Sequence, residues 1–206
     1  LPLKRRENSS PPLPEEKELL AAAQGGDRPS YGKIVEHYRQ RLYNAALAIV
    51  RNHDDARDLS QQAFVRAFKN IDRFQLDRPF YPWLYRILRN LCLDYVRKHG
   101  PARQVSLDRI VEESHVQFDT GQGHLVQDTG DVRDRIQREQ MAGFLRVEIE
   151  NLKPEFREII VMKHFDEMSY KEIAAALRIP MGTVMSRLYH ARKALVHSME
   201  KYRAET

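Results

Sequence analysis

The residues of this chain that could do chemistry are mainly aromatic and cationic, and they suit binding to nucleic acid. Four aromatic residues fall within six positions, at Phe80, Tyr81, Trp83 and Tyr85. Basic and polar residues follow them at Arg86, Arg89, Asn90, Arg97 and Lys98. Unpaired bases stack on aromatic rings while cations hold the phosphate backbone. The pattern therefore indicates a surface for single-stranded nucleic acid, although any one of these rings could instead belong to a hydrophobic core.

A second group of residues near the C-terminus predicts a helix-turn-helix. Ser169 and Glu172 have the spacing of a capping box, which starts a short helix. A turn over residues 178–180 follows, and Ala174 and Val184 have the spacing of residues packed where two helices cross. The second helix should expose Thr183, Ser186, Arg187, His190, Arg192 and Lys193. In such a motif the start of the second helix enters the major groove of duplex DNA. An ordinary helical hairpin would show the same spacing.

The charges are divided unevenly along the 206 residues. The totals are 34 Lys and Arg against 29 Asp and Glu, a formal net charge of +5. Residues 78–103 and 178–203 are basic blocks, each with six bases and one acid, whereas residues 104–132 hold six acids and one base. This division favours two nucleic-acid-binding surfaces separated by an acidic segment. Solvated helix faces on either side of a linker are the alternative.

Other classes of protein are disfavoured by what the chain lacks. The eight histidines have no metal-binding spacing, glycine-rich phosphate loops are absent, and Cys92 lies beside an apolar helix face. We therefore expect no catalytic activity, no cofactor and no metal. A single cysteine fits a reducing compartment, and no stretch approaches 18 apolar residues, so we expect a cytoplasmic protein without a membrane span.

The elements that must position these residues are predicted to be helices. Apolar residues recur at helical spacing, and no segment shows the alternation of a strand. We expect a short helix from Glu15 to Gly25–Gly26, a long helix over 31–49, a break at 52–55, and a third helix over 56–71. A loop over 72–79, a helix from about Pro82 to Gly100–Pro101, and further helices near Asp134, from Pro154 and from Ser169 complete the pattern.

The predicted fold class is all-α, with two small helical domains joined by a flexible acidic linker. Residues 1–14 are expected to be a disordered tail, 15–100 the first domain, 101–135 the linker, and 136–206 the domain with the helix-turn-helix. A linker of about 35 residues spans roughly 120 Å when fully extended but averages only about 30–35 Å as a coil.

Three motifs in order give the chain a resemblance to a known family. They are Asn52-His53-Asp54-Asp55-Ala56-Arg57-Asp58-Leu59-Ser60-Gln61, then Phe80-Tyr81-Pro82-Trp83-Leu84-Tyr85-Arg86-Ile87 with Asn90, and Pro180-Met181-Gly182-Thr183-Val184-Met185-Ser186-Arg187-Leu188 with Ala191-Arg192. With these motifs the chain resembles the extracytoplasmic-function (ECF) group of bacterial sigma-70-type RNA polymerase sigma factors.

The resemblance implies a role for each group of residues. Core RNA polymerase would bind Asp55, Asp58, Leu59 and Gln61. The −10 promoter element would be captured as a melted strand by the loop over 72–79 and by Phe80, Tyr81, Trp83, Tyr85, Arg86, Arg89, Asn90, Arg97 and Lys98. The −35 element would be recognised as duplex by Thr183, Ser186, Arg187, His190, Arg192 and Lys193. Core polymerase, promoter DNA and an anti-sigma factor are the implied partners, and we expect a monomer when the protein is free.

The sequence departs from the family pattern at three positions. Met185 and His190 stand where cationic residues are common, and Arg178 stands at a turn position usually held by glycine. Promoter preference therefore cannot be transferred from relatives. The chain starts at Leu1, so residues before it could be missing. A stand-alone helix-turn-helix regulator is the alternative function, but it leaves the aromatic–arginine block unexplained.

Overall fold

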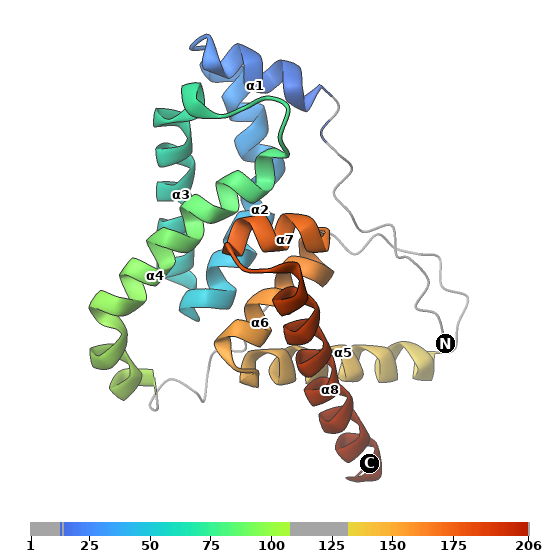
Figure 1. The fold of residues 1–206 in the computed structure, drawn as a ribbon. Helices are drawn as coiled ribbons and strands as arrows, with labels where there is room; N and C mark the ends of the chain where they lie inside the picture. The colour runs from blue at the N-terminus through green and yellow to red at the C-terminus, as the bar shows by residue number, and fades with distance from the viewer. Residues whose placement is uncertain (1–12, 14, 108–131, 206) are drawn as a thin grey trace.

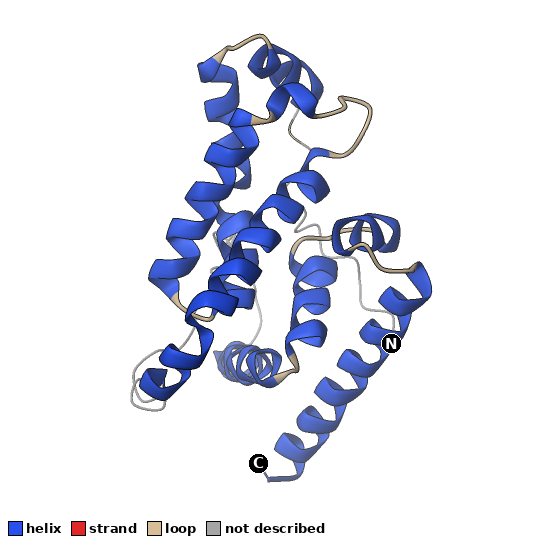
Figure 2. Cartoon of the chain, turned by 60° about the vertical axis from the view of Figure 1, so that its left-hand side comes forward, coloured by secondary structure: helices blue, strands red, loops and turns tan. Residues whose placement is uncertain are grey.

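The computed structural model describes residues 13, 15–107 and 132–205, and every regular element in these ranges is helical (Figure 1, Figure 2). This confirms the predicted all-α class. Most of the predicted tail and most of the predicted linker lie outside the described residues, so the predictions of disorder and flexibility are untested.

The N-terminal half is built on one long helix that three others contact. Its elements are α1 (Glu16–Gln24), α2 (Arg28–Val50), α3 (His53–Lys69), the 3-10 turn η1 (Ile71–Arg73) and α4 (Phe80–Leu107). Helix α2 packs against α1, α3 and α4. The core between them contains Ile34, Leu42, Ala63, Leu84 and Leu88, all fully buried. Burial of each large apolar side chain contributes about 1.5–3 kcal/mol.

Side chains at the helix ends explain where these helices begin. The Asp27 carboxylate accepts a hydrogen bond from the Ser30 N–H at 3.0 Å, at the start of α2. The Asn52 side-chain oxygen accepts one from the Asp55 N–H at 3.0 Å, at the start of α3. Each satisfies a backbone donor that has no partner within the helix. Gly26 follows α1 with φ +92°, a conformation that glycine adopts without strain.

The C-terminal half contains the predicted helix-turn-helix. Its elements are α5 (Val132–Asn151), α6 (Pro154–Ile160), the π-helical turn η2 (Val161–Phe165), α7 (Tyr170–Leu177) and α8 (Met181–Glu205). The capping box is present: the Glu172 N–H donates to Ser169 Oγ at 3.2 Å, and the Ser169 N–H donates to the Glu172 carboxylate at 2.8 Å. This pair fixes the start of α7, the first helix of the motif.

Several boundaries differ from the sequence-based predictions. Helix α4 begins at Phe80 and continues to Leu107, instead of running from about Pro82 to residues 100–101. Helix α3 begins at His53, because Asn52 acts as its N-cap, so the break is shorter than predicted. Helix α6 passes directly into η2, where the Asp166 N–H bonds to the Val161 carbonyl oxygen at 2.9 Å.

The two halves pack directly against each other, which the sequence does not predict. Helix α2 contacts α6 and η2, and α4 contacts α7 (Figure 1). Residues of both halves belong to one continuous hydrophobic cluster, and Ala48 of α2 packs with Val161 and Phe165 of η2 in a second one. The halves therefore share an apolar interface in addition to their chain connection.

Candidate nucleic-acid interface

Helix α8 has one buried face and one face open to solvent. Val184, Leu188 and Ala191 are fully buried, and α8 packs on α6 and α7. Of the residues predicted to contact the −35 element, Ser186, His190, Arg192 and Lys193 are exposed, and Thr183 and Arg187 are half-buried. The structure thus places the predicted DNA-contacting residues outside the hydrophobic seam of the helix.

The turn before α8 holds a strained residue. Arg178 has φ 55° and ψ 46°, the left-handed conformation expected for this position. Non-glycine residues pay roughly 1–2 kcal/mol there. The Pro180 carbonyl then accepts hydrogen bonds from the N–H groups of Thr183 at 2.9 Å and Val184 at 3.2 Å, so α8 starts immediately after the turn.

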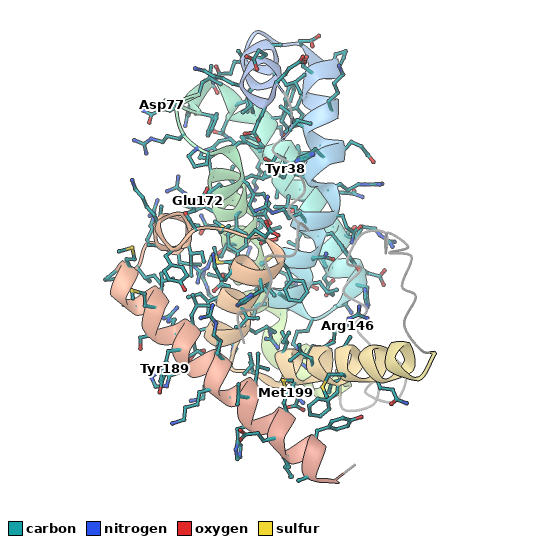
Figure 3. All side chains as sticks on the ribbon, turned by 90° about the vertical axis from the view of Figure 1, so that its right-hand side faces the viewer. Tyr38, Asp77, Arg146, Glu172, Tyr189 and Met199 are labelled. Carbon is teal, nitrogen blue, oxygen red and sulfur yellow. The ribbon has the colours of Figure 1, made fainter. Side chains whose placement is uncertain are left out.

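Large apolar side chains lie on the exposed face of α8, and sequence reasoning noted only Met185 among them, as a departure from the family pattern. Met181 and Met185 are each 53% exposed and Tyr189 is 63% exposed, and Tyr189 points away from the rest of the molecule (Figure 3). Their spacing of four residues, outside the buried positions, was the available signal. Apolar side chains in the major groove contact thymine methyl groups, so these three residues extend the candidate duplex-binding face.

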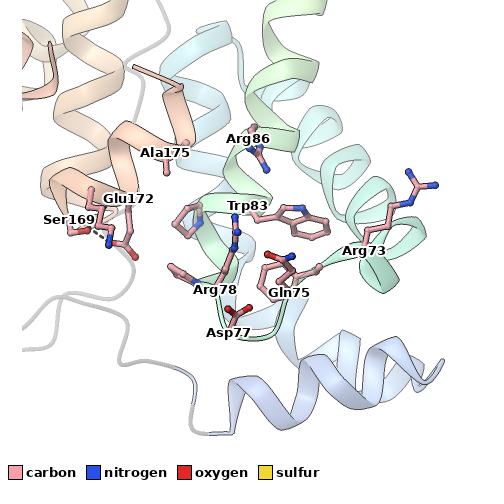
Figure 4. Close-up of a pocket in the computed structure, with 14 residues that line it drawn as sticks. Arg73, Gln75, Asp77, Arg78, Trp83, Arg86, Ser169, Glu172 and Ala175 are labelled. Atoms are coloured by element: carbon pink, nitrogen blue, oxygen red, sulfur yellow. Dashed lines mark hydrogen bonds between the residues drawn. The ribbon is translucent and has the colours of Figure 1, made fainter. Parts of the chain in front are cut away.

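The N-terminal candidate surface surrounds a pocket of about 820 Å³ (Figure 4). One wall comes from the loop over 74–79 and the start of α4, including Arg78, Trp83 and Arg86. The opposite wall comes from the C-terminal half, including Glu172 and Ala175 of α7. Trp83 is half-buried, with its ring centroid 5.1 Å from that of Phe74 and 5.6 Å from that of Phe80. A partly exposed aromatic ring, packed on two others, therefore lies beside several arginines.

Other predicted −10 contacts are not accessible in this arrangement. Phe80, Tyr81 and Tyr85 are 1–3% exposed, so as placed here their rings cannot stack on a base. Phe80 packs within the N-terminal core, with its ring 5.3 Å from that of Phe74. Tyr81 and Tyr85 instead lie beneath acidic residues of the C-terminal half. Trp83 is the aromatic residue of the four that keeps a partly exposed ring.

The cations of the same surface differ in their partners. Arg86 is half-buried beside the pocket, and Asn90, Arg97 and Lys98 are exposed. Arg97 pairs with Asp94 at 2.7 Å, where both side chains are mostly exposed, so the pair contributes little. Arg89 instead binds Glu158 of α6 through its Nε at 2.6 Å. The surface is thus partly open along α4 and partly closed by the C-terminal half.

Burial controls the ionisation of the covered groups. It raises the pKa of the Tyr81 and Tyr85 hydroxyls well above their usual range, and the charge of Asp166 or Glu158 nearby adds to this. Burial also raises the pKa of Asp166 to about 6, although Arg41 opposes the change. For Arg89, burial lowers the pKa, but the hydrogen bond and charge of Glu158 outweigh it, so the net pKa is raised. The tyrosines are neutral and Arg89 is cationic at physiological pH.

The candidate polymerase-docking residues lie on α3. Asp58 and Gln61 are exposed, and Asp55 is half-buried. Leu59 is only 3% exposed because it shares the buried face of α3 with Ala56 and Ala63, so it supports the helix from the core. The exposed side of α3 is therefore polar at the positions that the resemblance implicates.

No group of three or more His, Cys, Asp or Glu residues that could hold a metal occurs in the described part of the chain. Cys92 is fully buried, and burial raises its thiol pKa to about 12, which makes it unreactive. No helix in the described ranges is both long and apolar enough to cross a bilayer.

Comparison with known families gives two matches in chain order. Residues 34–101 match sigma-70 region 2, and residues 145–195 match sigma-70 region 4. The first range contains the aromatic–arginine block on α4, and the second contains α7 and most of α8.

Individual relatives agree with these matches over most of the chain. The ECF RNA polymerase sigma factor SigW of Bacillus subtilis is 32% identical, over 87% of this chain and 94% of the relative. The ECF RNA polymerase sigma-E factor of Escherichia coli is 30% identical, over 88% of this chain and 93% of the relative.

Two solved structures have a similar fold. CnrH in complex with the cytosolic domain of CnrY has a TM-score of 0.60 at 25% identity, covering 90% of this chain and 97% of that one. The sigma factor RpoE of Bartonella quintana, in complex with the anti-sigma factor NepR, has a TM-score of 0.60 at 22% identity, covering 82% and 96%. The chain belongs to the ECF group of the sigma-70 family, the alternative sigma factors that direct transcription initiation and are not themselves enzymes.

Proposed function

We propose that this chain binds core RNA polymerase and directs it to promoters through two DNA surfaces, one on each half. Residues 15–100 form the region 2 domain, which docks on polymerase and captures the melted −10 strand. Residues 136–206 form the region 4 domain, which recognises the −35 element as duplex. The observation that carries the proposal is the contrast along α8 between a fully buried seam and an exposed face rich in polar and cationic residues.

Duplex recognition would use the start of α8. Ser186, Arg187 and His190 would lie toward the base edges, while Arg192 and Lys193 would contact phosphates. Half or more of the hydrogen bonds at such interfaces go to the backbone, and side chains in the groove supply the sequence preference. The exposed Met185 and Tyr189 support a preference that includes thymine.

Capture of the single strand would use the pocket beside α4. Trp83 would stack on an unpaired base, and Arg86 and Asn90 would hold the adjacent backbone. Because duplex DNA hides its base faces, this surface can act only after the strands separate.

Polymerase would be needed to hold the two surfaces at the right separation. The 24 residues over 108–131 separate α4 from α5 and could reach about 80 Å if fully extended. An unrestrained chain of that length averages a much shorter span, so the free protein should bind promoters weakly. Docking through Asp55, Asp58 and Gln61 on α3 would place region 2 on the enzyme.

An anti-sigma factor is the further partner that we propose. CnrH, which has a similar fold, was solved in complex with the cytosolic domain of CnrY. A regulator of that kind would compete with polymerase for the faces through which the chain docks. Without such a partner, the chain would be a monomer.

Reconstitution with core polymerase tests the proposal directly. Purified chain, core polymerase and a mixed promoter library should yield transcripts that depend on the chain, with holoenzyme footprints over both promoter elements. The free chain should give a much weaker footprint. Repression without new transcripts would instead identify a stand-alone helix-turn-helix regulator, and a footprint of the free chain as tight as that of holoenzyme would refute the need for polymerase.

A further inference from the structure

One face of α4 is covered by the C-terminal half of the same chain. Tyr81, Tyr85 and Arg89 are spaced four residues apart and therefore share one side of the helix. All three belong to the proposed −10 surface. Tyr85 and Arg89 bind an acidic side chain of the C-terminal half, and another such side chain lies beside Tyr81.

The first contact is made by Glu158 of α6. Arg89 donates from Nε to Glu158 Oε1 at 2.6 Å and from Nη2 to Oε2 at 3.4 Å. The Tyr85 hydroxyl donates to the same Oε1 at 3.1 Å. The Glu158 side chain is 11% exposed and that of Arg89 is 26% exposed, so the pair is largely removed from water.

The second contact is made by Asp166, just after η2. Its carboxylate Oδ1 lies 3.5 Å from Nε of Arg41 on α2, and Arg41 Nη2 donates to the Asp166 carbonyl oxygen. The Arg41 guanidinium also lies over the Tyr81 ring, 3.5 Å from its centroid. Asp166 Oδ2 and the Tyr81 hydroxyl have no hydrogen-bond partner among the described residues, so this site is less completely satisfied than the first.

Helix α7 covers the same region from a second direction. Its residues Glu172, Ala175 and Ala176 form the wall of the pocket that faces Trp83 and Arg86 (Figure 4). A strand that stacks on Trp83 and continues along α4 would have to pass between α4 and α7, which are in contact. The covered face of α4 and the pocket beside Trp83 thus belong to the same candidate DNA surface.

The acidic groups occupy positions that suit DNA phosphates. An arginine fork binds a carboxylate and a phosphate in the same bidentate geometry, so one excludes the other. Glu158 therefore occupies the Arg89 guanidinium, which a phosphate of the −10 strand would need as its hydrogen-bond donor. In contrast, Ser186, Tyr189 and His190 of the duplex-binding face remain exposed.

We propose that the C-terminal half of this chain is an intramolecular competitor of single-strand binding, with Glu158 on Arg89 and Asp166 on Arg41 holding a closed state. The proposal rests on the assignment of α4 as the −10 surface. In the closed state the duplex-binding face of α8 and the exposed side of α3 stay accessible, so polymerase and −35 DNA can bind before the −10 surface is released.

The chemistry of the interface suits a reversible contact. Buried ion pairs add little net stability, because their attraction is offset by the loss of hydration. Removing one partner is disruptive, since the other charge is then left buried and uncompensated. The closed state should thus be specific in geometry and yet easily opened by a competing partner.

Closure can be measured in the free full-length chain by fluorescence energy transfer. Cysteines introduced for Val65 on α3 and Val196 on α8, both exposed, would carry the two dyes, because the buried Cys92 should not react. Glu158→Lys should lower the transfer efficiency by placing a cation against Arg89. Glu155→Lys, which makes the same charge change one turn earlier on α6 and outside the Glu158 contacts, is the matched control.

The binding measurement uses single-stranded oligonucleotides that carry the −10 segment of a promoter transcribed by the reconstituted holoenzyme. When the competent state is rare, the apparent dissociation constant is raised by the inverse of its population. Glu158→Lys should bind at least tenfold more tightly than wild type, and Glu155→Lys should not. Glu158→Gln provides a milder variant, and the pair Arg89→Glu with Glu158→Arg should restore high transfer efficiency without restoring DNA binding.

The outcomes separate this inference from the proposed function. Equal transfer efficiency in Glu158→Lys and Glu155→Lys, with both folded by circular dichroism, would overturn the closed state. Lower efficiency without a gain in oligonucleotide affinity would overturn the competition, provided that holoenzyme transcribes. If holoenzyme fails to transcribe, the proposed function fails, while the change in transfer efficiency still decides whether the closed state exists.

Discussion

The two candidate DNA-binding regions of this chain differ in how the free protein presents them. On α8 the candidate duplex contacts Ser186 and His190 are exposed. On α4 the candidate single-strand contacts Tyr81 and Tyr85 are buried, and Arg89 is paired with a carboxylate of the other half. Both regions combine aromatic and basic residues, so composition does not explain the difference. The difference in exposure arises because the acidic residues of the C-terminal half reach the surface of α4 and do not reach the exposed face of α8.

The difference fits the order in which the two DNA forms become available. Duplex −35 DNA is present before polymerase acts, whereas a −10 single strand exists only after the strands separate. A basic, aromatic groove left open would also bind unrelated single strands, because stacking and phosphate contacts tolerate most sequences. Covering that groove would therefore reduce non-specific binding without hiding the candidate duplex-binding face.

The largest expected effect comes from removing the Trp83 ring. Trp83→Ala should lower promoter opening by holoenzyme about tenfold to a hundredfold, because stacking contributes about 1–3 kcal/mol per base. Binding to the −35 element should be unchanged, since Trp83 lies on the other half of the chain. Permanganate reactivity of the −10 thymines measures opening, and normal reactivity would contradict the stacking role.

A control is needed because Trp83 also packs on Phe74 and Phe80. Trp83→Phe keeps an aromatic face and should retain most of the opening. Thermal unfolding of both variants separates lost stacking on DNA from lost packing within the domain.

The next effect concerns Arg187 on the exposed region. Arg187→Ala should weaken binding by about 1–3 kcal/mol and relax the preference at one −35 position, if the side chain contacts a base. Holoenzyme affinity for −35 variants changed one base pair at a time measures this. Because α8 is accessible in the closed state, the free chain should show the same relaxation, at lower overall affinity.

Lys193→Ala is the matched control for Arg187, since it removes one positive charge later on the same helix. It should weaken all sequences equally and reduce the salt dependence of binding. If Arg187→Ala also weakens scrambled −35 sequences equally, Arg187 contacts only phosphate.

Much of each region was predictable from local sequence. The capping box at Ser169 and Glu172, the turn at Arg178 and the buried seam of α8 were expected from spacing and confirmed. These features depend on residues three to ten positions apart. The burial of Leu59 also follows from its helical spacing with Ala56 and Ala63, although the family resemblance had placed it on the docking surface.

The contact between the halves was not predictable in the same way. Arg89 and Glu158 are 69 residues apart, and Arg41 and Asp166 are 125 apart. No periodicity relates such positions, and the acidic residues looked like ordinary surface charges of a second domain. Only the arrangement of the helices in space therefore shows which aromatic residues on α4 are covered.

A smaller effect should follow from acidification of the interface. The raised pKa of Asp166, about 6 against 3.8, means that the closed state binds a proton more tightly than the open or unfolded chain. The contribution of protonated Asp166 to the stability of the closed state is complete below pH 3.8 and is lost as the pH rises through about 6. Transfer efficiency should thus be higher at pH 5 than at pH 7.5, and Asp166→Asn should reduce this change.

The groups around Asp166 decide the sign of this effect. Burial disfavours the Asp166 carboxylate, whereas Arg41 on α2 and the nearby Tyr81 hydroxyl on α4 favour it. The difference between wild type and Asp166→Asn isolates this site from the other groups of the chain. Closure that weakens on acidification in wild type alone would show that the Arg41 attraction exceeds the cost of burial.

The smallest effect tests the turn that supports the exposed region. Arg178→Gly should stabilise the chain by about 1 kcal/mol, because glycine adopts the left-handed conformation at φ 55° without strain. For a chain of this size that corresponds to a rise of about 2–4 °C in the melting temperature. Arg178→Ala removes the same charge but keeps the Cβ atom, so the difference between the two variants isolates the backbone strain. If both variants melt at the same temperature, the left-handed conformation of residue 178 carries no measurable strain, and the expected stabilisation by glycine is wrong.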